Sequence, residues 1–194
     1  MNKIEKVKKY LKRNHGYITT NGLLSIGITK PYINTLINNG VIEKVSHGIY
    51  ADKEIIVDEY YILQKKYNDI VYSHNTALYF LNLTNRAPME IDITVPRDKK
   101  VRGNYKIHRV SNNLYNIGII EIIDPYGNTI KIYNAERCIC DILRNDVLDI
   151  ELRNRVLNYY FKSKCKDVDK LLEYAKAFKI YDKVNTIVGV MLNW

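Results

Sequence analysis

The sequence predicts an α+β protein in two parts: a small helical domain that ends in a β-hairpin, and a larger domain with a sheet and a helical bundle. Three observations support this. Apolar residues recur every three or four positions at the N-terminus, β-prone runs follow within residues 41–51 and 89–133, and helical periodicity returns after residue 133. We expect the domains to span residues 1–56 and 57–194.

Three short helices are predicted in the first domain. In the stretch NKIEKVKKYLKRN, apolar residues lie on one helical face and lysines on the other. The apolar positions are Ile4, Val7, Tyr10 and Leu11. Thr19 or Thr20 is suited to cap a second helix, and Gly27 is suited to end it. The third helix is expected to begin at Thr29, with Pro31 in its first turn, and to stop at the NNG run.

A small hairpin is predicted after the third helix. The runs VIEKV and IYA are β-prone, and the SHG between them contains Gly48, which suits the positive φ of a tight turn. Three helices followed by a hairpin predict a winged helix-turn-helix. In that fold the third helix enters the DNA major groove, while the hairpin, or wing, places Lys44 and His47 near phosphates.

Positive charge is concentrated in the same segment. Residues 1–53 contain nine lysines and arginines against three acids, so they carry +6 of the formal net charge of +9. A polyanion would be attracted there. The N-terminus is charged throughout, and no run approaches about 18 apolar residues. We therefore expect a soluble cytoplasmic protein without membrane contact.

The second domain is predicted to hold a small, mostly antiparallel sheet followed by a helical bundle. MEIDITVP alternates strictly, which predicts a half-buried strand with Met89 and Ile91 inward and Glu90 and Asp92 outward. NYKIHRV is expected to be a partner strand, and GIIEIIDPYGNTIKIY a hairpin around its DPYGN turn. Two helices should precede this sheet, in EIIVDEYYILQKKY and SHNTALYFLNL. Four should follow it, near residues 134–145, 148–162, 167–178 and 180–192.

Candidate catalytic and metal-binding residues are few. Glu90 and Asp92, two positions apart on one strand face, are a pattern with which nucleotidyltransferases bind Mg²⁺. The Gly-Ser-type turn that such enzymes need upstream is missing. The four histidines lack metal-ligand spacing. Cys138 and Cys140 are expected to be buried in a helical core. From these observations together, no metal site, cofactor or catalytic residue is assigned.

Three quoted stretches together resemble the AbiEi antitoxin family of bacterial abortive-infection systems. They are GLLSIGITKPYINTLINNGVIEKVSHGIY, SHNTALYFLNLTNRAPMEIDITVP and YNAERCICDILR. The resemblance implies a winged helix that binds inverted repeats in the promoter of its own operon and represses it. It also implies a C-terminal domain that counteracts a nucleotidyltransferase-like toxin without forming a stable complex, as type IV antitoxins do in defence against phage.

The resemblance also implies which residues bind DNA. Carried onto this sequence, the recognition-helix and wing positions are Lys30, Tyr32, Asn34, Thr35, Asn38, Lys44, Ser46 and His47. Arg137 and Asp141 lie four residues apart on one helical face and could form a structural ion pair.

Two alternatives stay open from the sequence. One is a winged-helix regulator whose C-terminal domain binds a ligand or another protein. The other is a Mg²⁺-dependent nucleotidyl-transfer enzyme that uses Glu90 and Asp92. We favour the hypothesis that the protein is a non-enzymatic antitoxin and autorepressor whose partner is double-stranded DNA.

Overall fold

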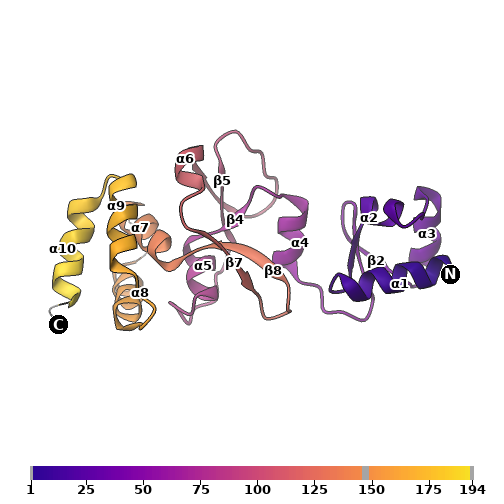
Figure 1. Ribbon diagram of the computed structural model, residues 1–194, viewed down its shortest axis with the longest axis horizontal. Coiled ribbons are helices and arrows are strands. Elements are labelled where there is room, and N and C mark those ends of the chain that lie inside the picture. Colours follow the sequence, from indigo (N-terminus) through magenta and orange to yellow (C-terminus); the bar gives the residue numbers. More distant parts are fainter. Residues whose placement is uncertain (1, 146–148, 193–194) are drawn as a thin grey trace. The chain divides into compact units, whose positions relative to one another are not determined.

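The α+β class is confirmed by the computed structural model, which describes residues 2–145 and 149–192 (Figure 1). By its contacts the chain divides into two compact units. The first comprises Met1–Asn68 with Ile123–Ile130, and the second comprises Asp69–Ile122 with Lys131–Trp194. The domain boundary at residue 56 stays a prediction. None of the described helices is long and apolar enough to cross a membrane.

The first unit has the element order of a winged helix. Its helices are α1 (Lys3–Arg13), α2 (Thr20–Ser25) and α3 (Lys30–Asn38). Its strands are β1 (Tyr17–Thr19), β2 (Glu43–Ser46) and β3 (Ile49–Ala51), antiparallel in the order β1-β3-β2. Strand β1 was not predicted. This three-residue segment is a strand because its backbone pairs with β3, from Tyr17 opposite Ala51 to Thr19 opposite Ile49.

Local side chains fix the ends of these helices as predicted. Thr19, rather than Thr20, caps α2, because its hydroxyl accepts a hydrogen bond from the Gly22 amide at 3.1 Å. Gly27 follows the C-cap with a φ of +82°, a conformation that favours glycine. Thr29 is the N-cap residue of α3, and Pro31 lies in the first turn, where a missing N–H breaks no helical bond.

Apolar faces of the three helices meet in one core. Its fully buried side chains include Val7 and Leu11 of α1, Leu23 of α2 and Leu36 of α3. Removing these side chains from water is the main stabilising contribution to so small a domain. The core thereby fixes which face of α3 is left in solvent.

A buried polar network joins β1 to the helix that follows the wing. That helix is α4 (Glu59–Lys66), and Asp58 caps it by accepting hydrogen bonds from two amides in its first turn. The Asp58 amide donates to Tyr17 Oη at 2.8 Å, and Asn128 Nδ2 donates to Asp58 Oδ2 at 2.7 Å. Burial and a hydrogen bond with Asp124 raise the pKa of Asp58 to about 6.

The five-stranded sheet is mixed, which differs from the mostly antiparallel sheet expected. It contains β4 (Val71–Tyr72), β5 (Asp92–Pro96), β6 (Lys106–Val110), β7 (Ile119–Ile123) and β8 (Thr129–Tyr133), in the order β6-β5-β4-β8-β7. β4 pairs antiparallel with β5, but β5 pairs parallel with β6 and β4 pairs parallel with β8. The parallel pairing of β5 with β6 arises because residues 97–105 carry the chain back along the strand before β6 begins.

The prediction that β5 is half-buried was wrong. The strand starts at Asp92, so Met89 and Glu90 precede it and are exposed, while Asp92 to Pro96 are all buried. β5 lies between two strands, and Asp92 is tolerated inside because it has polar partners, whereas Thr94 Oγ1 has no hydrogen-bond partner among the described residues. The Asp92 amide donates to Thr76 Oγ1 at 2.9 Å.

Helices complete the second unit. α5 (His74–Phe80) and α6 (Asn112–Tyr115) follow strands of the sheet, and α6 was not predicted. The four predicted C-terminal helices are confirmed as α7 (Ala135–Asn145), α8 (Ile150–Lys162), α9 (Val168–Ala177) and α10 (Tyr181–Leu192). Cys138 and Cys140 are buried on α7, as expected.

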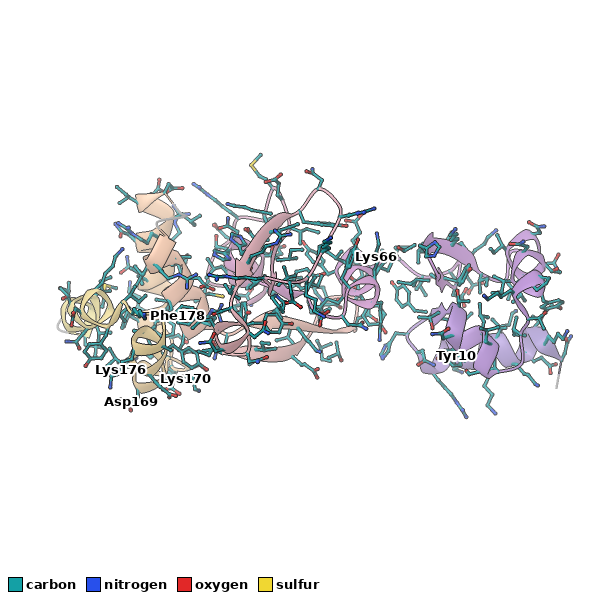
Figure 2. All side chains as sticks on the ribbon, turned by 90° about the horizontal axis from the view of Figure 1, so that it is seen from above. Tyr10, Lys66, Asp169, Lys170, Lys176 and Phe178 are labelled. Atoms are coloured by element: carbon teal, nitrogen blue, oxygen red, sulfur yellow. The ribbon has the colours of Figure 1, made fainter. Side chains whose placement is uncertain are left out.

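The helical layer has a buried side and a solvated side. Figure 2 labels Phe178, which is buried at the end of α9, and Asp169 and Lys176, which are exposed on the same helix. The Arg137 guanidinium lies 4.5 Å from the Phe178 ring and 4.0 Å from the Tyr133 ring. Its Nε donates to Asp141 Oδ2 at 2.9 Å, so the predicted Arg137–Asp141 pair is confirmed and is fully buried.

Candidate nucleic-acid interface

One face of α3 is polar and open to solvent. Ile33 and Leu36 are buried in the core, so the helix must turn its other side outward. Four of the predicted DNA-binding residues are exposed there: Lys30, Asn34, Thr35 and Asn38. Lys30, Asn34 and Asn38 follow one another at intervals of four and form a stripe along the helix. This stripe carries one positive charge and two amides that can donate and accept hydrogen bonds.

Tyr32 occupies a different position on α3. Its ring is half-buried and packs against the core, and Lys3 Nζ lies 4.6 Å from the ring centroid. This is the geometry of a cation–π contact. The arrangement brings a cation of α1 beside the N-terminal turn of α3, and it leaves the Tyr32 ring less open to solvent than the stripe.

The wing presents its polar residues at the hairpin. Lys44 lies in β2 and is exposed, and His47 is exposed in the turn. Ser46 is half-buried, because the register shifts between Lys44 and Ser46 where they pair with β3. Gly48 closes the turn with a φ of +71°, as the tight hairpin requires.

A basic groove borders the turn between α2 and α3. It encloses about 550 Å³ and is lined by Lys6, Lys9, Arg13 and Tyr10 of α1 together with Ser25, Ile26 and Gly27. The three cations recur at intervals of three and four and therefore share one face of α1. Their charges are evident from the sequence, but their position at this turn is not, because the approach of α1 to the turn is set by tertiary packing.

The second unit does not present Glu90 and Asp92 as a pair of free carboxylates. Glu90 is exposed before β5, whereas Asp92 is buried and its Oδ1 lies 2.7 Å from His108 Nε2. The neighbour of this carboxylate is therefore an imidazole nitrogen and not the second carboxylate that the Mg²⁺ hypothesis needed. A hard ion such as Mg²⁺ prefers oxygen ligands.

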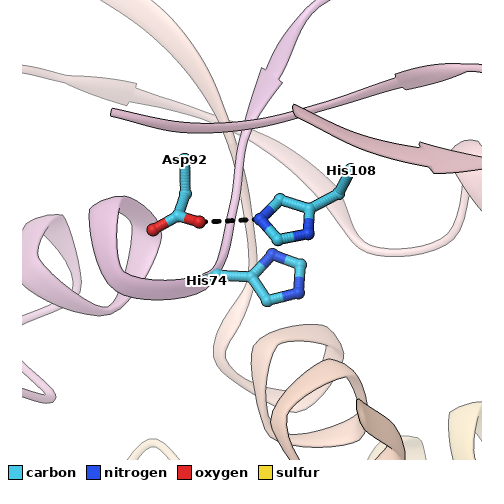
Figure 3. A group of neighbouring side chains, drawn as sticks. All are labelled: His74, Asp92 and His108. Atoms are coloured by element: carbon cyan, nitrogen blue, oxygen red, sulfur yellow. Dashed lines mark hydrogen bonds and ion pairs between the residues drawn. The ribbon is translucent and has the colours of Figure 1, made fainter. Parts of the chain in front are cut away.

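A second histidine, His74, lies beside the Asp92–His108 pair (Figure 3). The His74 and His108 rings are stacked, with centroids 3.6 Å apart and planes 15° apart. His74 is the first residue of α5 and has a φ of +46°. Burial lowers the pKa of His74 well below the ordinary histidine value, and the positive charges around it, beginning with His108, lower it further. His74 is therefore neutral at physiological pH.

This group of three residues could not be predicted from the sequence. The reason is that pairing, not spacing, brings them together: β5 and β6 align Thr94 with His108, and the Ser73 amide donates to the Asp92 carbonyl at 3.1 Å. These residues are 16 or more positions apart in the chain, so only the strand register could have revealed the group.

Comparisons with known proteins bear on the first unit. Residues 5–51 match the model of a family described as "Transcriptional regulator, AbiEi antitoxin". This segment runs from α1 to the end of β3 and so contains the α3 stripe, the wing and the basic groove. No curated protein matches the chain.

A solved structure extends the comparison to most of the chain. The RV2827C protein from Mycobacterium tuberculosis matches with a TM-score of 0.54 and 13% identity, over 94% of this chain and 77% of that one. At this identity the likeness shows a shared fold alone. The resemblance to AbiEi antitoxins that the sequence motifs indicated is thus confirmed over residues 5–51, the segment that forms the winged helix.

Proposed function

We propose that this protein is the antitoxin of a type IV toxin–antitoxin system active in abortive infection, and that it represses its own operon. In this proposal α3 and the wing bind inverted repeats in the promoter. One observation carries it: the family-matched winged helix exposes a Lys30–Asn34–Asn38 stripe on α3, next in sequence to a wing with exposed Lys44 and His47.

The chemistry of the stripe supports reading of base edges. The major groove admits an α-helix, and asparagine can form two hydrogen bonds with adenine through its amide. Lys30 and Thr35 are suited to phosphate or base contacts beside Asn34. In this arrangement the α3 stripe supplies sequence preference, while the wing and basic groove supply attraction to any duplex.

We expect replacement of Asn34 by alanine to lower affinity for the operator by about 1–3 kcal/mol, because paired hydrogen bonds to one base are lost. The change in affinity is measured by fluorescence anisotropy, with a labelled operator duplex titrated with each protein. Affinity for a scrambled duplex should change little. Asn39→Ala is the matched control, since Asn39 is exposed at the C-terminal end of α3 but faces away from the stripe. Equal losses in both variants would refute base reading by Asn34.

Replacement of Lys44 by glutamine should weaken binding to all duplexes alike. The slope of log K against log salt should become less steep by about 0.9, as expected when one phosphate contact is lost. Lys164→Gln removes the same charge from an exposed position in the second unit and should leave the slope unchanged. A Lys44→Gln variant that keeps the parent slope would show that the wing does not contact phosphate.

The second unit is proposed to oppose a nucleotidyltransferase-like toxin without a stable complex. Co-expression with the toxin encoded beside it tests this part. Rescue of growth by the full chain, without co-purification of the toxin, is the expected result. Growth arrest despite soluble antitoxin would contradict the proposal, and stable co-purification would contradict the type IV mechanism.

A further inference from the structure

Three side chains suited to metal coordination converge in the second unit: His74, Asp92 and His108 (Figure 3). They come from the start of α5, the start of β5 and the middle of β6. Each offers one ligand atom, and these three atoms lie within 4.8 Å of one another. Two imidazoles and one carboxylate are a ligand set that proteins use for divalent transition metals, zinc among them, and not for Mg²⁺ or Ca²⁺.

His74 is prepared for coordination by its surroundings. The side chain is buried, and its Nδ1 lies 3.0 Å from Ser73 Oγ. When Nδ1 carries the hydrogen and donates it to Ser73, Nε2 carries the lone pair. Nε2 is buried and has no hydrogen-bond partner among the described residues. A buried polar atom that lacks a hydrogen-bond partner is usually satisfied by a bound water molecule or an ion. The positive φ of His74 shows that the surrounding packing holds the residue in a costly conformation.

The other two ligands already occupy adjacent positions. His108 Nε2 and Asp92 Oδ1 are 2.7 Å apart, and a proton joins them. A divalent ion that binds between these atoms takes the place of the proton, which passes to solvent from an imidazolium or moves to Nδ1 of a neutral ring, so that a neutral His108 imidazole ligates through Nε2. The hydrogen bond of the Asp92 amide to Thr76 Oγ1 anchors the backbone that carries the carboxylate.

A cavity borders one member of this group, Asp92, while His74 and His108 do not line it. It encloses about 250 Å³, and Asp92 lies in its wall with Asn75, Glu90 and Lys106. Asn75 Oδ1 is buried and has no hydrogen-bond partner within the described part of the chain. The cavity therefore offers space for water beside Asp92.

We infer that His74, Asp92 and His108 form a divalent transition-metal site, with zinc the ion that this ligand set suits best. Coordination requires the stacked imidazoles to turn, because a metal lies in the plane of each ligating ring. Binding would join α5, β5 and β6 through one ion and stabilise the second unit. This inference is independent of the proposed binding of DNA.

Titration of the full chain with Co²⁺ tests the site, since Co²⁺ takes zinc positions and absorbs visible light when four-coordinate. The chain should carry no affinity tag and should have Cys165→Ser, because that exposed thiol is itself a soft metal ligand. We expect saturation at about one ion per chain and displacement by Zn²⁺. His108→Gln and Asp92→Asn should abolish the spectrum, and His15→Gln, at an exposed histidine of the first unit, should retain it.

Two results would overturn the inference: no saturable spectrum in the parent chain, or a spectrum that survives His108→Gln and Asp92→Asn. Circular dichroism first establishes that the variants are folded. If they are not, X-ray absorption of the zinc-loaded parent decides the question. A shell with two imidazoles and one carboxylate supports the site, and a shell without imidazole refutes it.

Discussion

Replacing Arg137 by methionine should lower the free energy of unfolding by about 3–5 kcal/mol, the cost of removing one partner of a buried ion pair. Arg137 is fully buried, and its Nη1 donates to the carbonyls of Leu114 and Ile117 while its Nε donates to Asp141. Methionine fills much of the volume but leaves these acceptors unpaired. Urea denaturation followed by circular dichroism gives the magnitude.

The backbone packs closely against Arg137. Gly118, at a φ of +81°, lies so near that a Cβ added at position 118 would approach Arg137 Cβ at 2.7 Å. Arg155→Ala is the control, because Arg155 forms an i,i+4 pair with Glu151 on the exposed face of α8. That change should cost less than about 0.5 kcal/mol. If Arg137→Met were no more harmful than Arg155→Ala, the buried pair would not stabilise the second unit.

The Asp58→Asn variant should be more stable than the parent above pH 7, by up to about 3 kcal/mol at 1.36 kcal/mol for each unit of pKa shift. The folded pKa of about 6 exceeds the unfolded value of 3.8, so the folded chain holds an extra proton between these limits. The contribution of Asp58 is therefore fully present below pH 3.8 and is lost as the pH rises to about 6. Asparagine mimics the protonated acid at every pH.

The amide at position 58 needs an acceptor for its new Nδ2. Asp124, which shares a hydrogen bond with Asp58, can supply it, because Asp124 Oδ2 has no other hydrogen-bond partner among the described residues. The difference in unfolding free energy between parent and variant, measured from pH 4 to pH 8, reports the titration of Asp58 together with that of any carboxyl coupled to it. A difference that does not change with pH would contradict the raised pKa of Asp58.

The winged helix was largely predictable because local signals agree with one another. Thr19, Gly27, Thr29 and Pro31 mark helix ends through their own backbone preferences, and apolar spacing identifies the buried faces. Strand β1 was not predicted because its three residues are too few to show a periodic pattern. They form a strand only through pairing with β3. Exposure of the α3 stripe follows from the spacing of Ile33 and Leu36, and so could be read from the sequence.

The second unit was less predictable because its polar residues are placed by tertiary contacts. Asp92 and Thr94 alternate with apolar neighbours and therefore resemble a solvent-facing strand edge. Both are buried because β5 lies between β4 and β6, and Asp92 has polar partners in Thr76 of α5 and His108 of β6. Strand direction also depends on the path of residues 97–105, which no local pattern reveals. Arg137 and Asp141 were found correctly because an i,i+4 pair is a local feature of one helix.

Binding of the full chain to duplex DNA from upstream of its own gene tests the central claim most directly. Fluorescence anisotropy would compare this duplex with a scrambled duplex of the same composition at several salt concentrations. The proposal predicts tighter binding to the upstream duplex at every salt concentration, by at least about 10³-fold, and weaker binding to both as salt rises. Equal affinity for the two duplexes would contradict sequence recognition by α3 and leave the basic winged helix as a contact for some other partner.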